Sequence, residues 1–526
     1  MKQFKFKYIL LLTAIGFTSC NKDLLDTVPN DRLSEDLFWK TQNDVLLALN
    51  SLYRDLDGTN IFAWDALTDI GHVNQPFAVD AYIANGTYDA TSSRILSEWT
   101  SAYTGIAAVN YFLENADNVT VTDAAAQSRY KAEARFLRAY QYVKLTTLYG
   151  AVPLITSTIS IADARTVSKE ELSKLYDFIN TELADIAPQL PLTYTGSDKG
   201  RITRGAARAL KARANLYAGR YADAATDAKA VIDLNTYSLY PQYSKLFSYA
   251  AENNQEVILD KQFIASSYSN NVFYLLGPYS QKSSQSTYVP TKALADKFQT
   301  ANGLDITDAA SGYDADHPYI NRDPRLGFSV FLDGDILPGG NVFHPAPNSG
   351  TADAVGNTYI ASTTGFNLKK YINTEDFANP SNNGINIILI RYAEVLLTYA
   401  EAKIENNDID QSVYDAINTV RNGRTDVKLA SIATGLTQAG LREIVRRERT
   451  VELAFEGLHL ADVRRWKTAA LVIPGPVYGI TYEDNGVFKI IQVAVNREFI
   501  DPKHYLWPIP QTETVQNPNL TQNSGW

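Results

Sequence analysis

The sequence holds very little sulfur, because its 526 residues include one cysteine, Cys20, and one methionine. A single cysteine cannot form a disulfide within the chain, so packing has to stabilise the fold. Basic residues are also outnumbered: 48 Lys and Arg face 58 Asp and Glu, which gives a formal net charge of −10. Binding to a phosphate backbone requires a basic patch, so this composition argues against nucleic acid as a partner.

Motifs of the common catalytic classes are missing as well. The five histidines, at positions 72, 317, 344, 459 and 504, include no pair at zinc-ligand spacing. There is no Gly-x-Ser-x-Gly turn and no phosphate-binding Gly-Lys-Ser/Thr loop, and we expect neither a metal nor a cofactor. Glycoside hydrolysis needs only two carboxyl groups, and 58 acids leave many pairs, so a surface glycoside hydrolase stays open as a minority alternative.

Aromatic side chains, in contrast, are plentiful, with 32 Tyr, 21 Phe and 6 Trp. Tyrosine offers a flat apolar face and a polar tip, which suits surfaces that are partly wet. Many of these rings will pack between helices, but their number leaves material for a binding surface. Sugars present apolar C–H faces with hydroxyl rims, so a glycan site needs exposed rings with polar side chains at the edge.

The N-terminus has the pattern of an export signal. Three lysines precede the apolar stretch 8–17, which is too short to span a bilayer, and small residues then lead to Cys20. A lone cysteine at this place looks like a bacterial lipobox, so we expect a signal peptide at 1–19, lipidation of Cys20 and a lipidated tether at 20–34. The alternative is an ordinary secretory signal that happens to end near a cysteine.

Helical periodicity and irregular sequence alternate along the rest of the chain, which we expect to form a single domain from 35 to 526. Helical patterns predict a frame over roughly 35–233 and 387–470. Between them, roughly 235–386 is rich in Gly, Asn, Ser, Pro and Tyr and predicts a long irregular insertion. The tail at 500–526 is too rich in Pro and Asn for a helix, and should run extended and dock by its apolar residues. Long loops on a rigid frame usually carry the function, so the insertion is the expected ligand-binding region.

Two stretches resemble paired helices of the tetratricopeptide type. Small residues fill 206–224, where Gly219 permits a turn between two helices that approach closely. A second such pair is predicted at 391–406 with 413–421. Stacked helical pairs bury each other's faces, so the sequence predicts a mostly α fold on a tetratricopeptide-like scaffold.

Four segments of the C-terminal half carry motifs of one known family. They are 322–326 (RDPRL), 391–402 (RYAEVLLTYAEA), 446–466, and the tail from YLWPIP at 505–510 to the terminal Trp526. Together with the N-terminal signal, these motifs closely resemble the SusD/RagB family, the SusD-like nutrient-binding surface lipoproteins of Bacteroidetes.

The resemblance implies a location, a partner and a task. A member of this family would be lipid-anchored in the outer membrane, facing the extracellular side, as a lid over a TonB-dependent, SusC-like transporter. It would capture an oligosaccharide and deliver it to the transporter without breaking a bond. A RagB-like role in binding peptides for a similar transporter, and a pure helical scaffold for other proteins, remain as alternatives.

The charged residues of the third motif have a structural explanation. Glu448, Arg449, Glu452 and Glu456 recur at spacings of three and four, so their side chains are neighbours on one helix surface. An Arg–Glu lattice of this kind predicts structural ion pairs and not a catalytic group.

The resemblance places ligand-contacting aromatics in the early irregular stretch 58–91 and in the insertion. Trp64 is the one tryptophan expected in a loop, and it has polar neighbours that could line a sugar edge. For each tyrosine, ordinary packing is the alternative. The candidate ligand-binding residues are Trp64, Asp65, Asp69, Asn74, Tyr82, Tyr88, Tyr268, Tyr274, Tyr279 and Tyr288.

Overall fold

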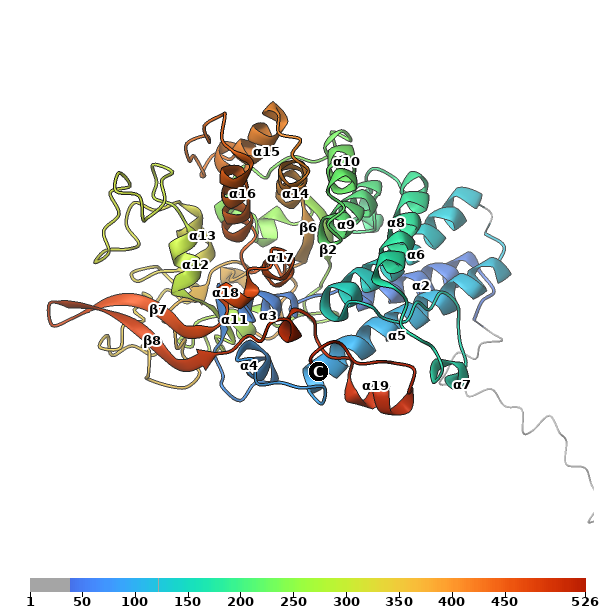
Figure 1. Cartoon of the computed structure of the whole chain (residues 1–526), viewed down its shortest axis with the longest axis horizontal. Helices are drawn as coiled ribbons and strands as arrows, with labels where there is room; N and C mark the ends of the chain where they lie inside the picture. Colours follow the sequence, from blue (N-terminus) through green and yellow to red (C-terminus); the bar gives the residue numbers. More distant parts are fainter. Residues whose placement is uncertain (1–37, 122) are drawn as a thin grey trace, which may run out of the picture.

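A computed structural model describes residues 38–121 and 123–526. The predicted signal peptide at 1–19, the tether at 20–34 and Cys20 lie outside the described residues. Helices form the right side and the top of the molecule in Figure 1, whereas loops and a long β-hairpin form its left side. The predicted fold class, mostly α with a long irregular insertion, is confirmed.

The long helices form the frame, and each packs on the next. Helix α5 contacts α6, α6 contacts α8, α8 contacts α9 and α9 contacts α10, which in turn contacts α14; α14 then contacts α15 and α16. Among the described residues, no helix has the length and apolar content needed to cross a bilayer. The frame helices are α2 (Gln42–Leu52), α5 (Ser93–Asn115), α6 (Ala124–Tyr149), α8 (Leu172–Ile186), α9 (Arg204–Tyr217), α10 (Tyr221–Ile232), α14 (Tyr392–Glu405), α15 (Gln411–Asn422) and α16 (Gln438–Glu452).

Both predicted helical pairs are present, as α9 with α10 and α14 with α15. Helix α9 begins where the Thr203 hydroxyl accepts the backbone N–H of Ala206 at 3.1 Å, which caps its first turn. Between the two helices, Gly219 has a φ of +71°, a left-handed conformation that glycine adopts without steric cost. The alanines of α9 are buried, so the neighbouring helices approach closely.

Short antiparallel strand pairs tie the insertion to the frame. Strand β1 (Gly71–Val73) pairs with β3 (Tyr288–Pro290), and β2 (Val257–Lys261) pairs with β6 (Ile387–Arg391), directly before α14. Inside the insertion, β4 (Val330–Phe331) pairs with β5 (Asn367–Leu368). The remaining short helices are α3 (Ile61–Ala66), α4 (Val79–Ala84), α7 (Ile161–Ala164), α11 (Val272–Leu276), α12 (Lys292–Lys297), α13 (Arg325–Ser329), α17 (His459–Arg465), α18 (Ala469–Val472) and α19 (Gln511–Gln516).

A long β-hairpin was not predicted from the sequence. Strands β7 (Gly475–Asp484) and β8 (Val487–Arg497) pair with each other and project from the lower left of the molecule in Figure 1. Asn485 and Gly486 join them with φ values of +52° and +80°, the left-handed pair that a tight hairpin turn requires. This Asn-Gly dipeptide between β-rich segments was the signal that could have revealed the hairpin.

The C-terminal tail docks by its apolar residues, as predicted. The side chains of Trp507 and Ile509 are fully buried and Leu520 is nearly so, while the Trp507 backbone N–H donates to Leu148 of α6 at 2.8 Å. The tail is not extended throughout, however, because residues 511–516 form α19. Pro510 precedes this single helical segment, a place where proline is tolerated because its missing N–H would be unpaired there.

Candidate functional site

The early loop and the insertion meet at one place, although they are about 200 residues apart in the sequence. Beyond the β1–β3 pair, the Asn74 backbone N–H donates to Thr287 at 2.9 Å. The Asn74 side-chain amide donates to the carbonyls of Ile360 and Ala361, and its oxygen accepts the backbone N–H of Thr363 at 2.7 Å. Asn74 is buried and therefore holds three loops in register.

A second set of hydrogen bonds continues this connection toward the surface. The Gln75 side-chain amide donates to the Gln285 carbonyl at 2.8 Å. The Gln285 amide in turn donates to the Tyr274 hydroxyl at 2.9 Å, and the backbone of these two residues is also paired. The loops that follow β1 and α11 are thus braced against each other by uncharged polar groups.

Two large aromatic rings project from these braced loops. Phe77 is 88% exposed and Tyr359 is 72% exposed. Phe77 follows Asn74 by three residues, and Tyr359 directly precedes Ile360, whose carbonyl accepts a hydrogen bond from Asn74. We call the surface formed by Gln75, Phe77, Tyr274, Gln285 and Tyr359 the loop face. Exposed rings beside amides and hydroxyls are the groups needed to stack on a sugar and bind its hydroxyls.

Trp64 does not lie in a loop, and that part of the prediction was wrong. It belongs to α3, is 7% exposed and packs on Trp507 of the tail with 5.5 Å between the ring centroids. The guanidinium of Arg94 covers the ring at 4.9 Å, so the indole has little free face. The cavity beside it measures about 80 Å³, well below the roughly 300 Å³ at which small-ligand sites begin.

The polar neighbours of Trp64 are also occupied by the protein itself. Asp65 is fully buried and accepts the backbone N–H groups of His459 and Gly457, and burial raises the pKa of its carboxyl to about 6. Asp69 pairs with His459 at 3.0 Å. These two carboxylates and Asn74 orient segments of the chain. None of the three is the exposed ligand contact that the sequence predicted.

Tyr88 and Tyr288 are core residues, against expectation. The Tyr88 ring lies 4.9 Å from Trp526 and 5.1 Å from His504, which fixes the end of the tail. The Tyr288 hydroxyl donates to buried Asp80 at 2.7 Å. Both rings are less than a tenth exposed, because strand and tail packing covers them.

The other four predicted tyrosines reach the surface. Tyr82 on α4 is 49% exposed and follows Phe77 in the chain, and Tyr274 belongs to the loop face. Tyr268 is 43% exposed and stacks flat on Phe263, with 5.4 Å between centroids and 12° between planes. Tyr279 is half-buried next to Ser280. Hydrogen bonds therefore link Tyr274 to the segments that carry Phe77 and Tyr359, whereas Tyr268 belongs to a separate aromatic pair.

Phe77 and Tyr359 were missed at the sequence level. Gln75-Pro76-Phe77 places a large apolar side chain directly after a proline in a polar stretch, and Tyr359 stands in Gly356-Asn357-Thr358-Tyr359. Proline and glycine in these contexts indicate loops, which usually run over the surface. That signal was available, although nothing in it says which loops meet.

We expect Trp64→Ala to destabilise the protein without changing ligand affinity. Deleting a buried indole from the contact with Trp507 should cost about 3–5 kcal/mol of the free energy of unfolding. Chemical denaturation measures this cost, and binding at a temperature where the variant is folded measures the affinity. Trp64→Phe should lose less stability. A Trp64→Ala variant of normal stability that no longer binds would show that the indole contacts the ligand.

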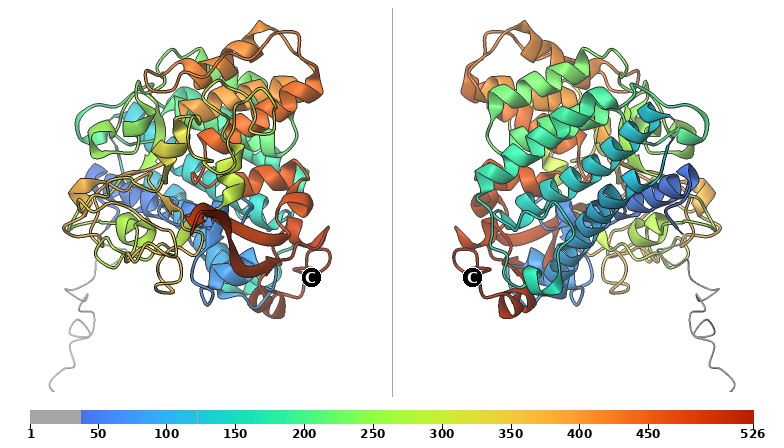
Figure 2. Two further views of the ribbon diagram at one scale, coloured as in Figure 1. Left: turned by 90° about the vertical axis from the view of Figure 1, so that its left-hand side faces the viewer. Right: turned by 90° about the vertical axis from the view of Figure 1, so that its right-hand side faces the viewer.

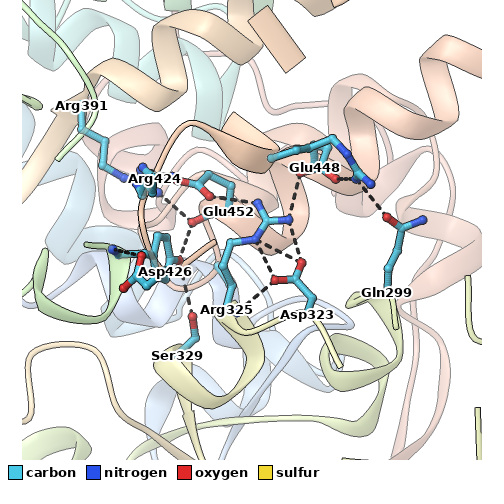
Figure 3. Close-up of polar contacts among 12 residues, drawn as sticks. Gln299, Asp323, Arg325, Ser329, Arg391, Arg424, Asp426, Glu448 and Glu452 are labelled. Atoms are coloured by element: carbon cyan, nitrogen blue, oxygen red, sulfur yellow. Dashed lines mark hydrogen bonds and ion pairs between the residues drawn. The ribbon is translucent and has the colours of Figure 1, made fainter. Parts of the chain in front are cut away.

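Glu448 and Glu452 of the predicted lattice belong to a buried network, which we call the central network (Figure 3), whereas Arg449 pairs separately with Glu401 and Asp462. Glu452 of α16 accepts from Arg391, Arg424 and Arg325 at 2.7, 2.8 and 3.0 Å, and Arg325 also contacts Asp323. All of these side chains are at most 1% exposed. The network joins the insertion to the C-terminal helices, and its burial and mutual pairing fit the predicted structural role.

The frame, with its helical pairs, belongs to the mostly α, tetratricopeptide-like class. The model of the SusD family matches residues 255–526, which is more than half of the chain. A second family, described as starch-binding and associating with the outer membrane, matches residues 29–216. The chain belongs to the SusD family, and the resemblance seen in its motifs is confirmed.

Relatives match along nearly the whole chain. SusD-like protein P2 of Formosa agariphila is 27% identical, covering 100% of this chain and 99% of that protein. The starch-binding protein SusD of Bacteroides thetaiotaomicron is 23% identical over 82% of this chain and 78% of its own length. Among solved structures, a SusD-like carbohydrate-binding protein of Bacteroides fragilis has a TM-score of 0.84 and 28% identity, covering 92% of this chain and 100% of that one.

Proposed function

We propose that this protein is a cell-surface glycan-binding lipoprotein that captures oligosaccharides at the loop face. The observation that carries the proposal is the pair of exposed rings, Phe77 and Tyr359, on loops that hydrogen bonds hold together. Membership of the SusD family supports the ligand class, because relatives of this chain are described as starch-binding and carbohydrate-binding proteins.

Binding without hydrolysis fits the acids near these rings. Asp80 follows Phe77 in the chain but is buried, accepting the Tyr288 hydroxyl and pairing with Arg94. Asp353 precedes Tyr359, is 4% exposed and accepts the Ser280 backbone N–H at 2.8 Å. Neither carboxyl group is free to act as the acid or the nucleophile that a glycoside hydrolase needs. We therefore propose a protein without catalytic activity.

The location and the partner complete the proposal. Lipidation of Cys20 would hold the protein on the outer membrane, facing the extracellular side, and the ligand would pass to a SusC-like, TonB-dependent transporter. The family matched by residues 29–216 is described as associating with the outer membrane, which supports this location. Peptide capture of the RagB type is the rival, and it would rely on main-chain hydrogen bonds and apolar pockets instead of stacked rings.

A screen of the purified protein against polysaccharides and a peptide digest tests the proposal. We expect one glycan to retard the protein in affinity gels, with no new reducing ends and no retention by peptides. Binding to peptides alone would favour the RagB-like role. If the purified protein released new reducing ends from the glycan, and this activity co-purified with it, the proposal that the protein is not catalytic would be contradicted.

A further inference from the structure

A cavity lined by polar and apolar groups lies in the helical frame and shares no residue with the loop face. Its volume is about 340 Å³, within the range of about 300–1,000 Å³ that is typical of small-ligand sites. The connection between α8 and α9 forms one wall, the segment after α10 a second, and the chain up to β2 a third. We call it the frame cavity.

Asp260 on β2 lines this cavity and, among the described residues, has no cation beside it. It is 3% exposed, and in the part of the chain that the structure describes it makes no ion pair. Its hydrogen-bonding neighbours are the side-chain amides of Gln262, at 3.5 Å, and Asn386. By comparison, buried Glu452 contacts three arginines. Burying a carboxyl group with so little compensation is costly.

The other groups around the cavity are mainly neutral donors and acceptors. Tyr194 and Tyr237 contribute rings, while their hydroxyls already bond to Glu133 and Ile202 and to Thr203. Gln255 contributes an exposed amide. Arg201 also lines the cavity, but its guanidinium already donates to Asp198, Glu133 and Asn50, so it is not available to an anion. Lys199, at the rim, is the remaining cation of the lining.

We propose that the frame cavity is a second saccharide-binding site, which takes one pyranose-sized unit and uses Asp260 to accept hydrogen bonds from its hydroxyl groups. Each sugar hydroxyl both donates and accepts, so it matches a lining of amides, hydroxyls and one carboxyl group. The ligand supplies the donors that the protein does not provide to Asp260. The site stands independently of the loop face and adds a second contact for a chain of sugars, or a separate site for a short one.

Asp260 should therefore be a residue kept for binding at the expense of stability. Burial, together with the nearby charge of Glu252, raises the pKa of its carboxyl to about 7. The unfolded chain loses this proton near pH 4, so the stability cost of Asp260 grows between about pH 4 and 7 and is complete above pH 7. Asp260→Asn removes the cost. Its melting temperature should exceed that of the wild type above pH 7 and match it below about pH 4.

The test measures saturation-transfer NMR signals of glucose, galactose, mannose, xylose and N-acetylglucosamine with the purified full-length chain. It uses the Phe77→Ala/Tyr359→Ala variant, in which the loop face has lost its rings. We expect at least one sugar to bind this variant, and Asp260→Asn in the same background to bind it at least tenfold more weakly. Asp376→Asn is the matched control, because Asp376 is also a buried acid without a cation but does not line the cavity. Its binding should not change.

Two results would overturn the frame cavity as a site. One is the absence of any sugar signal in the loop-face variant, and the other is a signal that Asp260→Asn leaves unchanged. The experiment separates the two proposals. If the loop-face variant loses all binding, only the frame cavity is excluded as a site. If wild-type binding depends only on Asp260, only the loop face is excluded.

Discussion

Glu452→Ala is expected to abolish stable folding, because it leaves three buried guanidinium groups without their shared anion. Burial by itself would raise the pKa of Glu452, but Arg424, Arg391 and Arg325 outweigh burial and hold it well below its usual range. Removing one member of a buried ion pair costs about 3–5 kcal/mol, and here three pairs lose the same member. Native proteins have only about 5–15 kcal/mol of stability in total. The expected result is little soluble protein, or a greatly lowered denaturation midpoint.

Glu171→Ala is the matched control for this loss. Glu171 carries the same charge, but its side chain is 73% exposed and faces Lys174 at 3.9 Å. Exposed pairs of this kind contribute about 0–1 kcal/mol, so the control should unfold close to the wild type. A Glu452→Ala protein that denatures at the wild-type midpoint would mean that the central network does not hold the insertion on the frame.

Phe77→Ala with Tyr359→Ala is expected to reduce glycan affinity about 100-fold. Each exposed ring that stacks on a sugar should contribute about 1.4 kcal/mol, which is a factor of ten in the dissociation constant. Because both rings are largely exposed, their removal should change the free energy of unfolding by no more than about 0.5 kcal/mol. Calorimetric titration of the glycan identified in the screen measures the affinity, and denaturation measures the stability.

Tyr478→Ala provides the control for a general loss of surface aromatics. Tyr478 lies on β7 of the hairpin and is 42% exposed, and it is not one of the five residues of the loop face. Its removal should leave glycan affinity unchanged. If the double variant binds as tightly as the wild type, the loop face is not the site, whatever the ligand.

The frame could be predicted from the sequence because its signals are local. Alanine-rich helices, the turn at Gly219 and the cap at Thr203 all act within a few residues, and the observed α9 and α10 fall where the pattern placed them. The hairpin was overlooked although its Asn485-Gly486 turn is equally local. The left view of Figure 2 looks along the projecting hairpin toward the body of the molecule, with the C-terminus at the lower edge. The position of the hairpin is set by contacts between distant segments, such as that of Ile480 with Thr364.

The candidate site was predicted only in outline. The sequence indicated that the early stretch and the insertion carry the binding surface, and the structure joins them through Asn74 and β1–β3. The sequence could not indicate which aromatic rings stay exposed, since their exposure depends on packing between distant segments. Trp64 is covered because Trp507, more than 400 residues later, docks on it. Phe77 is exposed because the loop after β1 is fixed by side-chain hydrogen bonds and not by apolar packing.

A crystal structure of the protein with the glycan that it binds is the most direct test of the central claim. The account predicts a sugar ring stacked on Phe77 or Tyr359, with its hydroxyls bonded to the Gln75, Tyr274 or Gln285 side chains. Density for sugar only elsewhere on the molecule, with both rings free, would contradict the assignment of the loop face as the capture site.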